Sequence, residues 1–366
     1  MNAADRPPSD WMPGLDRLRA LAALAVLFGH GGYFLIALWP NYDVFAAVAW
    51  LGTDAFFALS GFLLVRAILR EPPRRVDQVQ GFIVWRVWRI LPLFWIALLA
   101  QALLARVDAG TWPSTFTSFI VLTQNLAQPH PRFFGEAWNL PLLMGFSLVL
   151  PWMAYVAARS HRMASRLALL LAVALLLGLV VRGLWVDALN LSWDEGVRKV
   201  VLARLDSCIY GALAACLVSM WPGLSTQRRV LGVLAGGVLL LALAGFFLLA
   251  RDTSVVARIA LFTLSGIGFA LACLAWSTTT GAPPSSATRW LAQRSYALYL
   301  CNMPVLLGMM QLGFVQTPQA GRGLLLFVVW LFLSCGVAEA VHRWLERPLL
   351  ASRARSVSAA ASATSR

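Results

Sequence analysis

The stretch Gly14-Leu-Asp-Arg-Leu-Arg-Ala-Leu-Ala-Ala-Leu-Ala-Val-Leu-Phe-Gly-His30 decides how this chain folds. It is an apolar helix with a guanidinium near its start, Arg19, and an imidazole deep inside, His30. Eleven residues make about three helical turns and about 16 Å, so both side chains lie on one face, about half a bilayer apart. A histidine in hydrocarbon is costly, and the default interpretation is a functional residue. The alternative is a satisfied polar side chain inside a helical bundle.

The composition indicates a polytopic membrane protein. Of 366 residues, 60% are hydrophobic and 13% are charged, with a mean hydropathy of +0.72, whereas soluble domains are about a quarter charged. The net charge of +14 lies mainly in short loops between apolar runs, so membrane topology explains it and no nucleic-acid partner is expected. The five cysteines stand singly in apolar runs, which predicts neither a disulfide framework nor a metal site.

We predict an all-α transmembrane bundle of about ten helices. Apolar runs of spanning length fall near residues 15–37, 44–69, 81–105, 138–158, 165–185, 198–221, 228–250, 255–277, 290–314 and 322–345. Twenty-one of the 30 lysines and arginines fall on the side of the N-terminus, so the positive-inside rule places both termini in the cytoplasm. The start of the chain has no pattern of a cleaved signal peptide, and the first helix is expected to stay in the mature protein.

The predicted organisation is one domain with short ends. Residues 1–14 form a cytoplasmic N-terminal segment, residues 15–350 the transmembrane domain, and residues 351–366, rich in Ala, Ser and Arg, a disordered cytoplasmic tail. Residues 113–126 are too short and polar to span, and we expect a short helix at the outer face. His130 and His161 fall in loops, where we expect solvated side chains.

Three arginines form a candidate phosphate-binding group. Arg86 and Arg89 are three residues apart on one helical face and, like Arg19, lie near the predicted cytoplasmic boundary. The planar guanidinium suits phosphate, although arginines that flank spans can also serve only as topology anchors. The anchoring interpretation is favoured for the arginines near the end of the second span, Arg66, Arg70, Arg74 and Arg75.

The second apolar run adds an aspartate and a pair of small residues. Asp54 lies in its outer third, and because the first two helices are neighbours in the chain, we expect Asp54 to partner His30. Ser60 has no base beside it in the sequence, so Ser60-Gly61 is interpreted as a site of close helix packing and not as a nucleophile.

Taken in order, these motifs resemble the acyltransferase-3 family of integral membrane O-acyltransferases, which modify sugars of surface polysaccharides, lipids, glucans and some antibiotics. The matching pieces are Leu15-Asp-Arg-Leu-Arg19 with His30, Phe56-Phe-Ala-Leu-Ser60-Gly-Phe, Arg86-Val-Trp-Arg89-Ile-Leu-Pro92, Arg204-Leu-Asp206, Ser295-Tyr-Ala-Leu-Tyr-Leu and Glu346-Arg-Pro348. The resemblance implies a co-substrate, acyl-CoA (acetyl-CoA), that arrives from the cytoplasm, and a carbohydrate or glycolipid acceptor. It also implies a bacterial inner membrane location, His30 as the catalytic histidine, and Arg19, Arg86 and Arg89 on the coenzyme A phosphates.

Two positions depart from the family pattern. Leu143 stands where the family commonly has a glutamate, and Asn302 where it often has a histidine. Asp54, predicted here as catalytic, and Glu136 are possible substitutes for the missing glutamate.

The chemistry leaves alternatives open. His30 either takes the proton of the acceptor hydroxyl or is itself transiently acylated. A transporter or flippase with an intramembrane ion path, and a family member without activity in an envelope glycan pathway, are the rival functions.

Overall fold

The computed structural model describes residues 12–40, 42–189, 192–221, 223, 227–277, 283–314 and 320–349, and all regular elements within them are helical. The predicted tail at 351–366 lies outside the described residues, as do residues 1–11 of the predicted N-terminal segment. The first helix starts at Pro13, two residues before the predicted boundary, because proline suits the first turn of a helix.

Long helices dominate the described part of the chain. They are α1 (Pro13–Leu35), α2 (Tyr42–Arg70), α3 (Val76–Ala109), α5 (Leu140–Ala157), α6 (Met163–Leu189), α7 (Ile209–Met220), α8 (Gln227–Leu249), α9 (Val255–Ser277), α10 (Ser286–Gln311) and α11 (Ala320–Val341). Short pieces join them: α4 (Phe116–Ile120), η2 (Arg132–Asn139), η3 (Trp193–Arg198), η4 (Leu202–Arg204) and η6 (His342–Glu346). The short α4 falls within the predicted non-spanning stretch 113–126.

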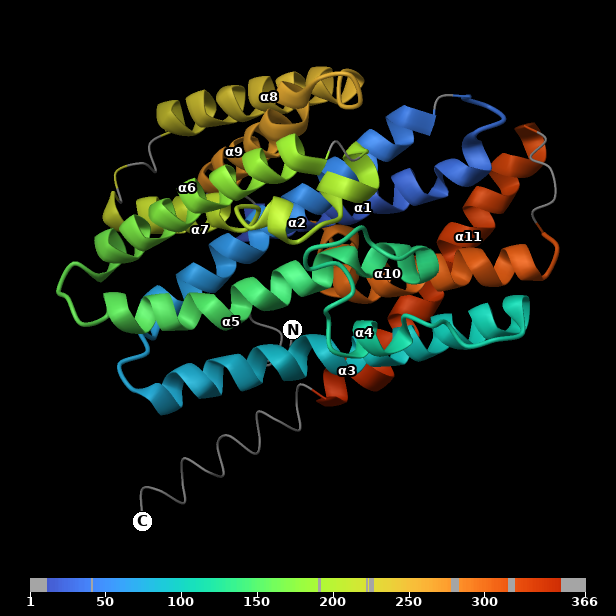
Figure 1. The fold of residues 1–366 in the computed structure, drawn as a ribbon, viewed down its shortest axis with the longest axis horizontal. Coiled ribbons are helices and arrows are strands. Elements are labelled where there is room, and N and C mark those ends of the chain that lie inside the picture. Colours follow the sequence, from blue (N-terminus) through green and yellow to red (C-terminus); the bar gives the residue numbers. More distant parts are fainter. Residues whose placement is uncertain are drawn as a thin grey trace, which may run out of the picture.

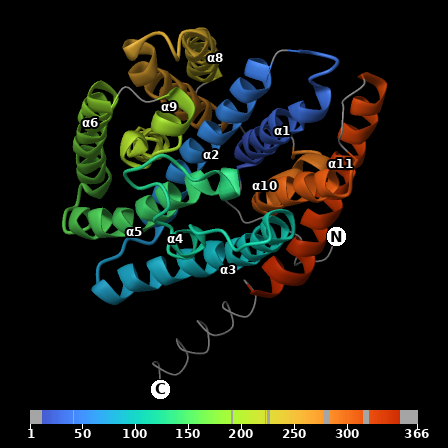
Figure 2. The same cartoon turned by 45° about the vertical axis from the view of Figure 1, so that its right-hand side comes forward.

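Most long helices run along the long axis of the molecule (Figure 1). In the turned view, α1, α2 and α10 lie at the centre, and α3, α5, α6, α8 and α11 lie around them (Figure 2). The central helices are in direct contact, with α1 packed on both α2 and α10. Arg19 and His30 therefore lie on a central helix.

Nine helices of the described residues are long and apolar enough to cross a membrane, which makes the chain an integral multi-pass membrane protein. The predicted span at 290–314 differs from the rest. It forms α10, 26 residues long, but polar side chains such as Arg289, Arg294 and Asn302 lower its hydropathy. The helix packs against α1 and α11, so part of its polar side meets protein instead of lipid.

The span predicted as one helix over 198–221 is broken. The chain passes through η3 and η4 before α7 begins at Ile209. Arg182 from α6 donates to the carbonyl of Ala203 at 2.8 Å, in the irregular part. Irregular backbone at membrane depth is tolerated where protein surrounds it and satisfies its polar groups. Arg182 and Arg204, which the charge count assigns to the outer side of the membrane within the predicted spans 165–185 and 198–221, are buried.

The α2–α7 contact confirms the interpretation of Gly61 as a packing residue. A Cβ on Gly61 would lie 1.9 Å from the carbonyl oxygen of Cys208, and one on Gly211 would lie 1.8 Å from that of Ala58. No side chain fits at such distances, so the two glycines let the helices cross closely.

Candidate active site

His30 on α1 is hydrogen-bonded to Asn302 on α10. The distance between His30 Nδ1 and Asn302 Oδ1 is 2.7 Å. Asn302 is fully buried, while His30 is half-buried. The position where the family often has a histidine is therefore occupied here by an amide that contacts the predicted catalytic histidine.

The His30 ring lines a cavity of about 450 Å³. Its walls come from α1, α2, η2, η3, the end of α8 with the loop after it, and α10. Among the lining residues are Tyr33, Asp43, Thr53, Glu136, Trp138, Trp193, Asp194, Arg198, Lys199, Arg251 and Tyr299. The cavity lies at the end of the bundle where α1 ends and α2 begins. A polar cavity with a few converging ionisable groups is typical of a ligand site.

Most charges in this cavity are already paired. Asp194 contacts Arg198 at 2.5 Å and Lys199 at 2.6 Å. Burial opposes ionisation of Asp194, but the two cations outweigh it and hold its pKa at about 2. Arg251 pairs with Asp43 at 2.5 Å. Among the described residues, the Glu136 carboxylate has no hydrogen-bond or ion-pair partner, so it is the acidic group free to meet a ligand.

The three predicted arginines come together at the opposite end of α1. The charge of Arg89 acts on both Arg19 and Arg86. Arg19 contacts Asp16 at 3.4 Å, and Arg86 donates to the Ser147 hydroxyl at 3.2 Å. A cluster of three like charges with so little compensation is suited to bind a polyanion.

A closed gap separates the arginines from His30. It is lined by Ala23 and Leu27 of α1, Phe56 of α2, and Leu298 and Asn302 of α10, and it has no room for a water molecule. Positions 19, 23, 27 and 30 follow one another on a single face of α1. The gap therefore lies on the line from Arg19 to His30.

The expectation that Asp54 partners His30 is wrong. The Asp54 carboxylate contacts the Arg204 guanidinium and the Ser265 hydroxyl, and Arg204 lies 3.8 Å above the ring of Phe262. Asp54 and Arg204 are both almost completely buried. The prediction that α1 and α2 are neighbours is confirmed. Chain order could not show, however, that Arg204, 150 residues away, contacts Asp54.

Leu143, at the position of the family's glutamate, packs beside the apolar cluster of Phe57, Trp138 and Leu142 and does not line the His30 cavity. One turn later, Ser147 donates to the carbonyl of Leu143 at 2.7 Å and accepts from Arg86. Glu136 does line the cavity, so of the two predicted substitutes only Glu136 lies with His30.

His130 is buried, contrary to the expectation of a solvated loop residue. Its Nε2 lies 2.9 Å from the carbonyl oxygen of Phe134. Burial, with a smaller contribution from the charges of Lys199 and Arg198, lowers the pKa of His130 to about 4. The ring is therefore a neutral structural group, and the outer connection that carries it is packed and not loose.

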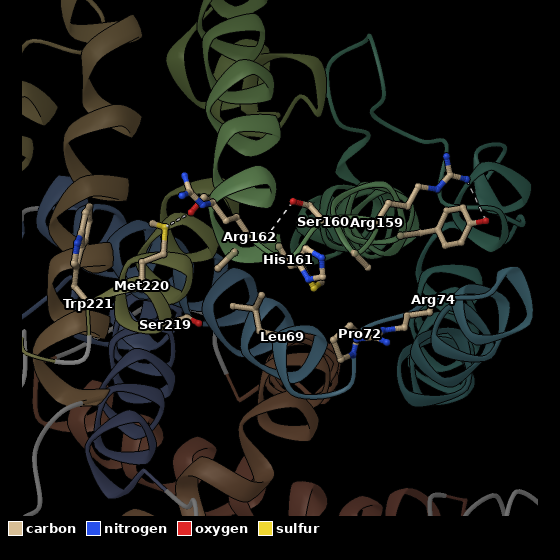
Figure 3. A pocket seen from close by; sticks show the side chains of 15 residues that line it. Leu69, Pro72, Arg74, Arg159, Ser160, His161, Arg162, Ser219, Met220 and Trp221 are labelled. Carbon is tan, nitrogen blue, oxygen red and sulfur yellow. Dashed lines mark hydrogen bonds between the residues drawn. The ribbon is translucent and has the colours of Figure 1, made fainter.

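A second hollow, of about 990 Å³, lies where α2 and α7 end and α6 begins. Figure 3 shows Arg74 and Arg159 on one side of it, Met220 and Trp221 on the other, and His161 between them. Its lining includes three arginines, the third being Arg162, and no carboxylate. We predicted Arg74 only as a topology anchor. The signal for this hollow in the sequence is the stretch 159–166, which contains Arg159, Arg162 and Arg166 and no carboxylate.

Comparison with known proteins shows the family of the chain. A model of the acyltransferase-3 family, described as an acyltransferase domain, matches residues 12–339. The chain belongs to this family. The chain is 24% identical over 386 residues to the peptidoglycan O-acetyltransferase OatA of Listeria monocytogenes, and this match covers 95% of the chain. It is 22% identical over 373 residues to the O-acetyltransferase OatA of Staphylococcus aureus, and this match covers 93% of the chain. The chain spans 57% of the length of each of these relatives. No solved structure matches it.

Proposed function

We propose that this acyltransferase-family protein moves an acetyl group from acetyl-CoA to a hydroxyl of a glycan, in the bacterial inner membrane with both termini in the cytoplasm. The names of its relatives support acetyl transfer and favour peptidoglycan as the acceptor.

One observation carries this proposal. A single face of α1 joins an arginine cluster at one end of the bundle to an imidazole in a polar cavity at the other. The arginines suit the phosphates of coenzyme A, and the gap between α1, α2 and α10 must open to admit its thioester arm. The acceptor enters from the opposite end, so donor and acceptor meet at His30.

The reaction needs one proton carrier. In direct transfer, His30 takes the proton of the acceptor hydroxyl while the hydroxyl oxygen bonds to the thioester carbonyl carbon. The carbon–sulfur bond breaks, and the coenzyme A thiolate takes the proton from His30. In the covalent route, His30 is acylated first and the hydroxyl then displaces it. Closed packing around the arm keeps water from the thioester.

The experiment is turnover of acetyl-CoA by the purified protein in lipid nanodiscs with peptidoglycan fragments as acceptor. We expect His30→Ala and Arg19→Ala each to abolish ester formation while the protein still inserts and elutes as a folded species. Full activity in His30→Ala would refute the catalytic assignment. Absence of turnover in the unmodified protein, with ion or lipid flux instead, would identify the transporter.

Glu136 is our candidate for orienting the acceptor. Its carboxylate is unpaired within the described chain and faces the cavity, where it can accept a hydrogen bond from a sugar hydroxyl. We expect Glu136→Gln to raise the KM for the acceptor about 10-fold, because Gln keeps an acceptor oxygen but loses the charge, a difference of roughly 1.4 kcal/mol. The KM for acetyl-CoA should stay unchanged. Equal changes in both constants would contradict this assignment.

A further inference from the structure

The hydrogen bonds of Asn302 allow only one orientation of its amide. The amide nitrogen donates to the carbonyl of Leu298 at 2.9 Å and to that of Tyr299 at 2.8 Å, which uses both of its N–H groups. Exchanging oxygen and nitrogen would set Oδ1 against two carbonyl oxygens with no hydrogen between them. Oδ1 therefore faces His30.

An oxygen at 2.7 Å from Nδ1 can only accept, so Nδ1 must carry the hydrogen. We infer that Asn302 is a positioning residue that holds His30 as the Nδ1–H tautomer and leaves the lone pair on Nε2. Nε2 has no protein partner among the described residues, and the ring lines the cavity. This inference rests on the proposed function for its consequence in catalysis, although the tautomer itself is independent of it.

Asn302 is held firmly enough to impose this choice. Its side chain is fully buried, and its own carbonyl accepts from Trp330 Nε1 of α11 at 2.9 Å. Rotating the amide would break its hydrogen bonds to His30, Leu298 and Tyr299, each costly to leave unmade in a buried place. A partner fixed on one ring nitrogen determines which nitrogen is available for chemistry.

The tautomer gives both chemical routes the same reacting atom. In direct transfer, Nε2 takes the proton of the acceptor hydroxyl and then gives it to the coenzyme A thiolate. In the covalent route, Nε2 bonds to the acyl carbon as the carbon–sulfur bond breaks and the thiolate leaves. The acceptor oxygen then bonds to the acyl carbon and displaces Nε2, and the hydroxyl proton passes to the freed Nε2 and from there to the thiolate. In each route the positive charge formed on the ring is stabilised through Nδ1–H by Asn302, which adds no charge of its own to the resting site.

The direct test is the nitrogen-15 NMR spectrum of the full-length protein labelled at histidine, with the His30 signals identified by their absence in His30→Gln. We expect a protonated Nδ1 and an unprotonated Nε2 at alkaline pH. A protonated Nε2 would overturn the inference, and no variant at position 302 is needed for this result.

Two substitutions then test the effect on rate. Asn302→Leu removes the acceptor, and we expect kcat to fall about 10- to 100-fold, as for other partners that orient a histidine, with the KM for acetyl-CoA unchanged. Asn302→Asp keeps an acceptor, so kcat should recover at high pH, while its carboxylate favours the protonated ring and moves the acidic limb of the rate profile to higher pH. Cys301→Ala, buried on the same helix, is the control and should behave as the unmodified protein.

The pH comparison must take account of the other ionisable groups in the cavity. They are Tyr33 of α1, Asp43 of α2, Glu136 of η2, Asp194 and Arg198 of η3, Lys199 directly after η3, Arg251 in the loop after α8, and Tyr299 of α10. These groups are the same in every variant, so a shift seen in Asn302→Asp and absent from Cys301→Ala belongs to position 302. An Asn302→Leu protein that folds and keeps its kcat would refute the positioning role; loss of turnover in the unmodified protein would refute the proposed function alone.

Discussion

Two histidines of this chain lie in different surroundings. His30 has one nitrogen fixed by Asn302 and lines a polar cavity. His130 is buried, with Nε2 bonded to the Phe134 carbonyl. The first ring can exchange a proton with a ligand, whereas the second can accept one only at a cost in stability.

The pH dependence of stability tests this role of His130. Its pKa is about 4 in the folded chain and near 6.5 when unfolded, so the unfolded chain binds the proton first as pH falls. The free energy of unfolding should therefore drop between pH 6.5 and pH 4, by up to roughly 3 kcal/mol from this residue. We expect His130→Gln to lose less on acidification in thermal unfolding, while His161→Gln, exposed in the second hollow, matches the unmodified protein. Parallel acid curves for both variants would contradict the burial argument.

At the scale of elements, an ion pair ties α2 to the irregular segment before α7. Asp54 and Arg204 are buried together, and the neighbouring pair of Arg182 and Asp206 is fully buried as well. The closely packed glycines Gly61 of α2 and Gly211 of α7 bring these two helices together. The broken helix is thus fixed on both sides, which positions η3 as a wall of the His30 cavity.

Removing one partner of this pair should destabilise the bundle. Asp54→Asn leaves Arg204 as an uncompensated buried charge, which costs roughly 3–5 kcal/mol, and we expect Asp54→Asn with Arg204→Met to regain much of that loss in thermal unfolding. Asp43→Asn, whose aspartate is 57% exposed and pairs with Arg251, should cost less than about 1 kcal/mol. An Asp54→Asn protein of normal stability but without turnover would instead restore the catalytic role predicted from the sequence.

The whole molecule has two differently charged ends. The cavity of His30 mixes acids and bases, whereas the hollow at the other end contains Arg74, Arg159 and Arg162 without a carboxylate. That end also carries the cluster of Arg19, Arg86 and Arg89. Under the proposed function, a donor with several phosphates approaches there, and the acceptor approaches the other end.

The hollow should therefore contribute to donor binding. We expect Arg159→Gln with Arg162→Gln to raise the KM for acetyl-CoA about 10-fold, the equivalent of about 1.4 kcal/mol, without a change in kcat. Arg132→Gln, an arginine 89% exposed near the acceptor end, is the matched control. If both proteins keep the KM of the unmodified enzyme, the hollow has no part in donor binding.

Sequence alone determined the class of fold, the central helix and the arginine cluster. The reason is that helical periodicity and hydropathy are local: a residue's place on α1 relative to Arg19 follows from counting turns, and spanning length follows from the bilayer. It also identified Asn302 and Leu143 as departures, because motifs are read in order along the chain.

Tertiary structure alone decided the partners. The Asp54–Arg204 contact spans 150 residues and the His30–Asn302 contact 272, and no local pattern specifies which of several buried polar groups will meet. The break before α7 and the acid-free hollow arise in the same way, from side chains of helices distant in sequence, whereas the burial of His130 arises from the packing of Phe119 and Phe134 around it. A buried polar group must be satisfied by whatever packing brings beside it, so its role follows from the assembled bundle.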